Sequence, residues 1–330
     1  MRLTLEEIAK IAGVSKATVS RVINDVPSGV GEETRKHVQS VLSELHYSND
    51  SFMHSMRSKS LALILPDITN PFFADIARAV TRKAITENYV VILVETEFSE
   101  EKEQEYISKL ISKKVDGIIL VPSGRACTDA HFLPEKYHVP MVLLDRKLDG
   151  AHSYAGIYSD NEYVAFGCCE RLIKSGAREI VFISGPLNVS TSTERMDGYK
   201  DALIHYEIPF DHRKVRIGNY TVESGYQAIL ELEKENISYS AVLAANDLMA
   251  LGALRALKEF SYKIPEEKQI IGFDNIDFSK YCEPSLSTVQ QPSIQMGSQA
   301  VETLLKLIGG KKVSQTIRLQ PKILYRQTTK

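Results

Sequence analysis

Polar and aromatic side chains follow the apolar, β-type segments of this chain, at the point where each segment ends. Carboxylates and amides can hydrogen-bond to neighbouring hydroxyl groups, and aromatic rings can cover the C–H faces of a sugar ring. Seven segment ends supply such groups. The residues are Asn70, Phe72, Phe73, Asp145, Arg146, Arg195, Tyr220, Asn246, Asp274 and Gln291. This mixture predicts one binding site for a polyol.

The charges within this set balance, because two aspartates are matched by two arginines. A phosphorylated ligand would leave a surplus of negative charge to be buried, so we expect a neutral ligand. Each member also has a simpler explanation. Asp-Arg pairs form ordinary salt bridges, adjacent phenylalanines pack in cores, and Asn or Asp after a strand caps the next helix, as we expect for Asp247. The joint pattern across both halves of the chain favours the binding site.

A second candidate site lies in residues 4–24, TLEEIAKIAGVSKATVSRVIN. Helical spacing predicts a first helix whose buried stripe is Leu5, Ile8, Ala9 and Ala12. Thr4 is placed to cap this helix, and Glu7 completes a capping box. Gly13 supplies the turn, and Ser15 can cap a second helix. The segment therefore predicts two short helices joined by a tight turn.

The second helix leaves a polar face free. Its predicted buried stripe is Val19, Val22 and Ile23, and its opposite face carries Lys16, Ala17, Ser20, Arg21 and Asn24. A basic tip with short polar groups at one-turn intervals suits a helix in the DNA major groove. The alternative is an ordinary hairpin with a solvated face. Charge does not decide between them, since residues 1–60 carry eight basic and seven acidic side chains.

These sites need a small helical domain and a large α/β core to position them. A third helix with Val38, Val41, Leu42 and Leu45 would close the small core. Beyond it, apolar runs expected to be buried on both faces occur at residues 61–65, 90–94, 117–121, 140–144, 179–184, 241–245 and 269–273. Helical stretches lie between them, among them residues 73–88, 101–114, 161–175, 194–206 and 247–260. This alternation predicts doubly wound parallel sheets in two lobes, with ligands beyond the carboxyl ends of the strands.

The segments EIAKIAGVSKATVSRVIN and GEETRKHVQSVLSELHY resemble the headpiece of the LacI/GalR family of transcriptional regulators. Every position of the family pattern A-x-x-A-G-V-S-x-x-T-V-S-R-V-x-N is filled from Ala9 to Asn24. The resemblance implies that Lys16, Ala17 and Arg21 face base edges. It further implies that Ser15, Thr18 and Asn24 hold phosphates, and we group Thr4 with these candidate DNA-binding residues.

By the same resemblance, residues 48–60 form a hinge that folds on DNA and wedges one side chain into the minor groove. Met56 stands where the family usually has leucine. The sequence departs from the family in having Asn49-Asp50 in place of Pro-Asn and Met53 in place of alanine. A flexible linker is the alternative.

The resemblance extends over the core, which is similar to periplasmic sugar-binding proteins with two lobes and three chain crossings, placed near Ser159, Gln291 and Pro321. It divides the chain into a headpiece at 1–47, a hinge at 48–60, an N-terminal lobe at 61–159 and 291–321, and a C-terminal lobe at 160–290 and 322–330. The ten candidate effector residues match the pattern of ribose-binding proteins and ribose-operon repressors, with Tyr220 where these often have phenylalanine. D-ribose is therefore the favoured effector, and another neutral pentose or a hexose is the alternative.

Composition and motifs exclude several other classes. The chain has 330 residues, is 43% hydrophobic and 25% charged, and carries a net charge of −2, which does not suit a nonspecific polyanion binder. No nucleotide-binding, nucleophile-elbow or zinc-protease motif occurs, and no histidines pair at metal-ligand spacing. The four cysteines lack zinc-site spacing and are expected to be reduced thiols. Without a secretory or membrane-spanning segment, the expected location is the cytoplasm.

The leading hypothesis is that the protein is a transcriptional regulator that acts as a repressor and binds a pseudo-palindromic operator as a homodimer. A neutral sugar between the lobes would release it. No cofactor or metal is expected, and no membrane partner. One rival, known in a branch of the family, is a catabolite-control regulator switched by a phosphorylated carrier protein. The other is a carbohydrate enzyme with a helical appendage.

Overall fold

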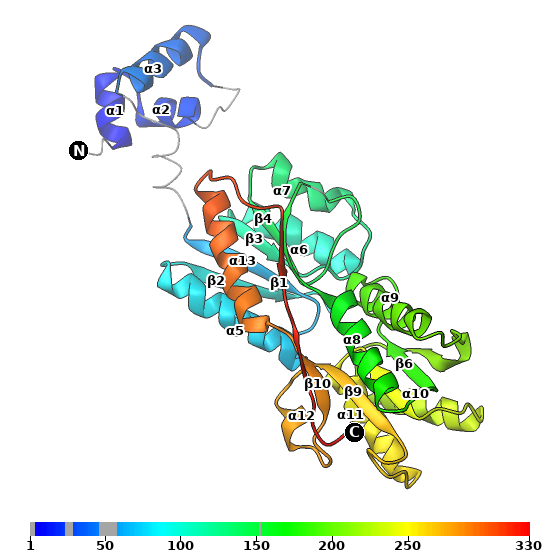
Figure 1. The fold of residues 1–330 in the computed structure, drawn as a ribbon. Helices are drawn as coiled ribbons and strands as arrows, with labels where there is room; N and C mark the ends of the chain where they lie inside the picture. Colours follow the sequence, from blue (N-terminus) through cyan, green and yellow to red (C-terminus); the bar gives the residue numbers. More distant parts are fainter. Residues whose placement is uncertain (1–3, 24–28, 46–57, 152) are drawn as a thin grey trace. The chain divides into compact units, whose positions relative to one another are not determined.

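The computed structural model describes residues 4–23, 29–45, 58–151 and 153–330. Residues 1–58 and 59–330 form two separate compact units (Figure 1). Asn24 and Met56, both predicted to contact DNA, lie outside the described residues. No helix in the described ranges is long and apolar enough to cross a membrane.

The first unit is a small helical domain of α1 (Leu5–Ile11), α2 (Lys16–Ile23) and α3 (Glu32–Glu44). Its core is formed by the predicted stripes, with Ile8, Val19 and Val38 fully buried. Gly13 has a φ of 62°, a left-handed conformation that glycine adopts without strain, so the chain can turn sharply between α1 and α2. The predicted helix-turn-helix is confirmed.

The second unit contains two six-stranded sheets (Figure 1). The first sheet has the order β11-β5-β4-β3-β1-β2. Its strands are β1 (Ser60–Leu65), β2 (Val90–Glu95), β3 (Gly117–Leu120), β4 (Met141–Leu144), β5 (Ala155–Ser159) and β11 (Thr316–Leu319). All neighbouring strands in it are parallel. We call this sheet and its helices the N-terminal lobe.

The second sheet has the order β12-β10-β9-β8-β6-β7 and belongs to the C-terminal lobe. Its strands are β6 (Ile180–Ser184), β7 (Val215–Ile217), β8 (Ala241–Ala244), β9 (Gln269–Asp274), β10 (Ser287–Gln290) and β12 (Lys322–Leu324). Only β12 runs antiparallel to its neighbour. The chain passes between the sheets three times, after β5, after β10 and after β11. The predicted fold class is confirmed.

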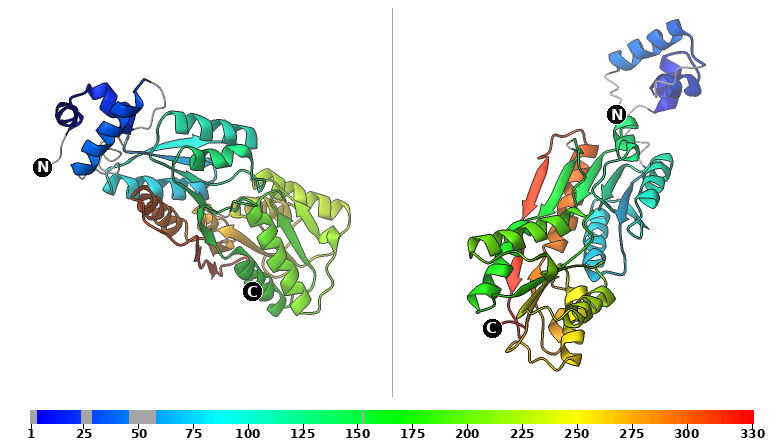
Figure 2. Two further views of the ribbon diagram at one scale, coloured as in Figure 1. Left: turned by 90° about the horizontal axis from the view of Figure 1, so that it is seen from above. Right: turned by 90° about the vertical axis from the view of Figure 1, so that its right-hand side faces the viewer.

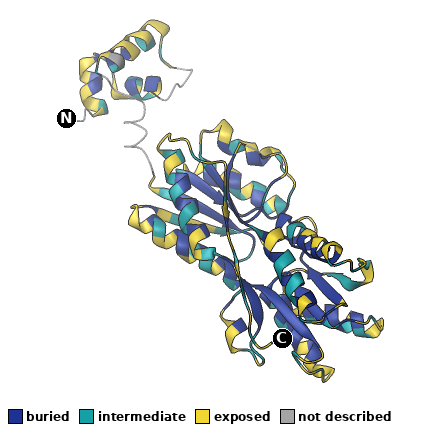
Figure 3. Ribbon diagram, viewed as in Figure 1, coloured by how far each residue is buried: buried dark blue, intermediate teal, exposed yellow. Residues whose placement is uncertain are grey.

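Helices cover both faces of each sheet, as the view on the right of Figure 2 shows for the C-terminal lobe. The N-terminal lobe has α5 (Pro71–Thr86), α6 (Glu100–Ser112), η1 (Asp129–Phe132), α7 (Leu133–Lys136) and α13 (Ser293–Ile308). The C-terminal lobe has α8 (Asn161–Lys174), α9 (Ser190–His205), η2 (His212–Lys214), α10 (Val222–Lys234), α11 (Asp247–Glu259) and α12 (Phe278–Tyr281). In β1, Leu61 and Leu63 face one helical layer while Ala62 and Ile64 face the other, so the strand is buried on both sides (Figure 3).

Three details of the expected elements are wrong. The run at 90–94 is not buried on both faces, because β2 lies at the sheet edge and leaves Val90, Ile92 and Leu93 exposed. Helix α9 begins at Ser190, four residues before the predicted start at 194. Asp247 does not cap α11 either, since the Asn246 side chain accepts the hydrogen bond from the Met249 N–H at 2.9 Å.

Glycines allow α10 and α11 to pack backbone against backbone. A Cβ atom at Gly252 would lie 1.9 Å from the Val222 carbonyl oxygen, and one at Gly225 would lie 2.0 Å from the Met249 carbonyl oxygen. We expect Gly252→Ala to lower the free energy of unfolding by about 3 kcal/mol, because rigid backbone must move. Urea unfolding of the full chain measures this. Gly309→Ala is the control, since its Cβ would meet nothing closer than 3.4 Å. Equal stability of the two variants would contradict the prediction.

Candidate functional site

The helical domain presents the predicted DNA-binding face in an ordered form. The Thr4 hydroxyl accepts the Glu7 N–H at 3.3 Å, and the Glu7 carboxylate accepts the Thr4 N–H at 2.6 Å, which completes the predicted capping box. These bonds to Thr4 lower the pKa of Glu7. At the start of α2, the Ser15 hydroxyl accepts the Thr18 N–H at 3.1 Å. Both helices therefore start where the sequence predicts.

The outward side chains of α2 remain accessible. Lys16, Ala17 and Arg21 are exposed, while the apolar stripe of the helix is buried. Lys16 forms an exposed ion pair with Glu6 at 3.1 Å, and Arg21 lies 3.5 Å from the Gly29 carbonyl oxygen. Such exposed contacts are weak, so both cations can turn to a nucleic acid.

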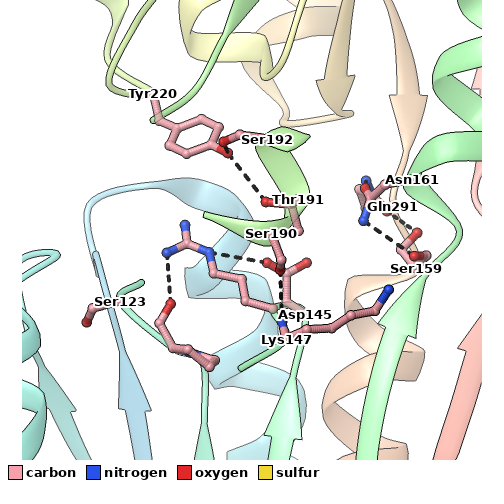
Figure 4. A network of polar contacts seen from close by, with 12 residues as sticks. Ser123, Asp145, Lys147, Ser159, Asn161, Ser190, Thr191, Ser192, Tyr220 and Gln291 are labelled. Atoms are coloured by element: carbon pink, nitrogen blue, oxygen red, sulfur yellow. Dashed lines mark hydrogen bonds and ion pairs between the residues drawn. The ribbon is translucent and has the colours of Figure 1, made fainter. Parts of the chain in front are cut away.

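In the core, the carboxyl ends of strands from the two sheets meet. Lys147, which follows β4, donates its N–H to the Ser190 hydroxyl at the start of α9 at 2.9 Å (Figure 4). The Ser159 hydroxyl at the end of β5 donates to the Gln291 side-chain oxygen after β10 at 2.6 Å. The residues after these strands therefore form a polar cluster between the lobes, as expected for parallel sheets.

Asp145 and Arg146 lie at the centre of this cluster and are both buried. Arg146 donates to the Pro122 carbonyl oxygen at 3.1 Å, and its Nε lies 3.8 Å from an Asp145 oxygen. Aromatic rings surround the guanidinium, with centroids 5.4 Å away for Phe73, 5.3 Å for Phe98 and 5.8 Å for Tyr220. Asp145 Oδ1 and Arg146 Nε accept or donate no hydrogen bond within the described ranges.

Burial shifts the pKa values of these groups in the direction that favours their uncharged forms. It raises the pKa of Asp145, against the pull of Arg146 and Arg195, and it lowers the pKa of Arg146. Burial also raises the pKa of Asp274 to about 7, with Asp145 adding to the rise and both arginines opposing it. The four charges therefore act on one another, as expected for groups that share one site.

Arg195 is held by three contacts in the C-terminal lobe. Its Nε donates to the Asn161 side-chain oxygen at 3.0 Å, and its Nη1 donates to the Ala245 carbonyl oxygen at 2.5 Å. The guanidinium also stacks over Phe273, with 4.6 Å to the ring centroid. Fixed in this way, Arg195 adds a buried positive charge to the cluster.

Tyr220 has its hydroxyl group occupied by the protein. It lies 2.6 Å from the Ser192 hydroxyl (Figure 4). The Asn246 amide donates to the Tyr220 carbonyl oxygen at 3.0 Å. The extra hydroxyl of tyrosine over phenylalanine is therefore satisfied internally. Asn246 holds Tyr220 on one side and caps α11 on the other.

The remaining predicted residues divide between cluster and core. Phe73 contacts Arg146, whereas Phe72 packs edge-on against Phe73 in the apolar core at 5.1 Å between centroids. Asn70 caps α5 by accepting the Phe72 N–H at 3.0 Å. A polar pocket of 430 Å³ reaches Asp274 and Gln291 but none of the other eight predicted residues.

Three residues of the cluster are absent from the predicted set. Phe98 follows β2, whose end supplied no candidate, and the same rule would have found it. Asn161 and Ser192 lie at helix starts and contact the cluster only through the tertiary fold. Within the described ranges, no group of three or more His, Cys, Asp or Glu side chains could hold a metal ion. The four cysteines are free thiols.

A helix-turn-helix domain joined to a two-lobed core with buried polar groups between the lobes defines a DNA-binding regulator with a small-molecule domain. Residues 4–50 match the family model described as bacterial regulatory proteins, lacI family, and residues 169–329 match a periplasmic binding protein-like domain. The chain is 32% identical to catabolite control protein A of Priestia megaterium over 100% of both chains. It is 31% identical to the transcriptional repressor PurR of Klebsiella pneumoniae, over 98% of this chain and 96% of the relative.

Solved structures agree with this assignment. A complex of the transcriptional regulator CelR with cellobiose has a TM-score of 0.77 at 29% identity and covers 99% of this chain and 100% of that one. A LacI family regulator from Enterococcus faecium with bound ribose has a TM-score of 0.73 at 30% identity, over 82% of this chain and 98% of that one. The chain belongs to the lacI family of bacterial transcriptional regulators. These relatives are regulators rather than enzymes, and they do not confirm a particular similarity to ribose-operon repressors.

The raised pKa of Asp274 predicts a pH effect on stability. The Asp274 carboxyl group binds its proton more tightly in the folded state than in the unfolded state. The free energy of unfolding therefore falls as the pH rises from the unfolded-state pKa, near 4, to the folded-state pKa of about 7. We expect Asp274→Asn to raise the midpoint of thermal unfolding at pH 8 and to leave it unchanged at pH 4. Calorimetric scans of both proteins across this range are the measurement. Parallel curves for the two proteins would show that Asp274 has an ordinary pKa.

Proposed function

We propose that this regulator represses a carbohydrate operon as a homodimer and leaves its operator when a neutral sugar binds between the lobes. The ten effector candidates would line that site. The sugar we favour is D-ribose. Family members bind operator DNA and small-molecule effectors and function as dimers, so the proposal concerns the identity of the effector and of the genes.

Two buried atoms of the cluster that have no hydrogen-bond partner among the described residues carry this proposal. Asp145 Oδ1 can accept a hydrogen bond, and Arg146 Nε can donate one. Leaving such atoms unpaired costs free energy, so a ligand that satisfies both gains affinity. Adjacent hydroxyl groups of a sugar can do both at once, and the rings of Phe73 and Phe98 lie close by.

Counted by residue type, Asp145 and Asp274 match Arg146 and Arg195, so a neutral ligand leaves no formal charge of the set unmatched. The relative with bound ribose and the CelR complex with cellobiose support sugars as a class. Because the Tyr220 hydroxyl is bonded to Ser192, it fills space and adds no free donor. This favours a small sugar such as D-ribose over a larger one.

A second candidate function is control by a phosphorylated carrier protein. The full-length similarity to catabolite control protein A favours it. Titration of the regulator and an operator fragment with the phosphorylated carrier separates the two functions. Tighter operator binding with the carrier, together with no response to any sugar, would favour this second function.

At the DNA, we assign Lys16, Ala17 and Arg21 to base edges. We assign Thr4, Ser15, Thr18 and Asn24 to the backbone contacts, and Met56 to the minor groove. The exposure of the first three side chains supports their assignment, since they are the part of α2 that DNA can reach.

Arg21→Ala tests base contact. We expect a loss of about 1–3 kcal/mol on the operator, with relaxed preference at one base pair, because a guanidinium reads guanine through two hydrogen bonds. Binding to a library of operator variants measures both effects. Lys36→Ala on α3 is the control, because this exposed cation pairs with Glu32 and lies outside the assigned face. A uniform loss on all DNA sequences would make Arg21 a phosphate contact.

Asp145→Asn tests the sugar site. Calorimetric titration with D-ribose, other pentoses and common hexoses should identify D-ribose as the tightest ligand of the wild-type protein. The variant should bind it about 10- to 100-fold more weakly, as expected for a lost bond to a charged group, and should keep operator affinity.

Asp129→Asn, an exposed residue on η1, should leave sugar binding unchanged. Tight binding of a phosphorylated sugar in place of a neutral one would overturn the charge argument.

A further inference from the structure

Asn161 lies at the junction of the polar cluster and is itself buried. As the first residue of α8, it follows the first chain crossing directly. Its side-chain oxygen accepts Arg195 Nε–H at 3.0 Å, and its Nδ2 donates to Glu194 Oε2 at 3.0 Å. One amide thus joins a guanidinium to a carboxylate.

Chemistry fixes the orientation of this amide. A guanidinium can only donate hydrogen bonds and a carboxylate can only accept them. The oxygen of Asn161 must therefore face Arg195, and its nitrogen must face Glu194. Gln291 Nε2 lies 3.4 Å from the same oxygen, which ties the amide to the second chain crossing as well (Figure 4).

Glu194 continues the connection to the other lobe. Its Oε1 pairs with Lys147 Nζ at 2.5 Å. Lys147 follows Asp145 and Arg146 directly after β4, so it belongs to the N-terminal lobe. The chain of contacts Lys147, Glu194, Asn161, Arg195 therefore crosses between the lobes.

The last bond of this chain matters for the orientation of Arg195. The bond to Ala245 and the stacking on Phe273 hold the guanidinium within its own lobe. The Nε bond to Asn161 adds a third fixed point, so the plane of the group cannot rotate freely. The remaining donors are then held in one direction.

We propose that Asn161 is a positioning residue that orients Arg195 for the effector and makes this orientation depend on closure of the lobes through Glu194 and Lys147. The inference rests on the proposed effector site. A sugar bound to Arg195 would then favour the closed arrangement without touching Lys147, because the two equilibria are linked.

A sugar-free measurement tests the dependence on Lys147. The ¹H–¹⁵N signal of Arg195 Nε–H in the full-length protein can be assigned by its loss in Arg195→Lys. Lys147→Met should shift this signal and raise its exchange rate with solvent about tenfold. Lys147 is 42% exposed, so the substitution should not disturb folding.

The matched control is another side-chain contact between the lobes. Arg125 donates to the Thr193 hydroxyl at 3.2 Å but has no bond to Glu194 or Asn161 among those described. Arg125→Gln should leave the Arg195 signal in place. An unchanged signal in Lys147→Met, or equal shifts in both variants, would overturn the dependence on closure.

A swap of amide and carboxylate tests the role of Asn161. Asn161→Asp keeps the acceptor for Arg195 but turns a second carboxylate toward Glu194, and should weaken D-ribose binding about tenfold. Adding Glu194→Gln restores a donor between the two positions and an acceptor for Lys147, so the double variant should recover most of the affinity. A double variant no better than Asn161→Asp alone would refute the positioning role.

Failure of the proposed function looks different. If the wild-type protein does not bind D-ribose, the assignment of the sugar is wrong, and the swap is then read from the Arg195 signal alone. That signal should be displaced in Asn161→Asp and return in the double variant. If it does not return, Asn161 does not position Arg195.

Discussion

Three charged side chains buried between two lobes, Asp145, Arg146 and Arg195, impose the constraint on which the core depends, and Asp274 lies half-buried beside them. A buried ion without partners costs several kcal/mol, so each must find opposite charge or hydrogen bonds. The protein meets this demand by placing Arg146 among three aromatic rings and Arg195 on Asn161, Ala245 and Phe273. Both aspartates of the cluster have a backbone conformation that is unfavourable for residues other than glycine, because Asp145 has a φ of 64° and Asp274 has a φ of 108°. Such left-handed conformations persist only where the surroundings hold them, and they are typical of ligand sites.

The helical domain and most strands could be predicted because their signals are local. Capping groups, a turn glycine and apolar periodicity act within a few residues, and all of them have the predicted roles around α1 and α2. Burial of a strand is not local. The segment at 90–94 is as apolar as its neighbours, but it pairs only with β1 at the sheet edge, and strand order depends on the whole sheet. No side chain caps the start of α9, so the sequence gives no capping signal for its early start.

For the polar cluster between the lobes, the sequence predicted which residue types gather. It did not predict which of their polar groups are bonded within the protein. The strand-end rule brings Asp145, Arg146 and Arg195 together correctly. It cannot tell that the amides of Asn246 and Gln291 are engaged by the protein, since their partners lie 26 and 132 residues away in the chain. The same limit hid Asn161 and Ser192. Their polar atoms gain meaning only from the tertiary contacts, so residues that support a site are harder to predict than residues that follow strands.

The strength of the contacts between the lobes decides whether the cleft can work as a switch. Lys147 and Arg125 are partly exposed, and neither the ion pair of Lys147 with Glu194 nor the hydrogen bond of Arg125 to Thr193 is expected to contribute more than roughly 1 kcal/mol. Buried contacts that contributed several kcal/mol would hold the lobes closed whether or not an effector was bound. A ligand acts only through its different affinity for the two arrangements, and effects of about 1–3 kcal/mol are typical of allosteric proteins. In the proposed effector site, contacts from a sugar to Asp145 in one lobe and Arg195 in the other would be of that size and would form only when the lobes are close. Under the proposed function, weak contacts between the lobes and stronger contacts from a bound effector at the buried centre would let the effector control closure.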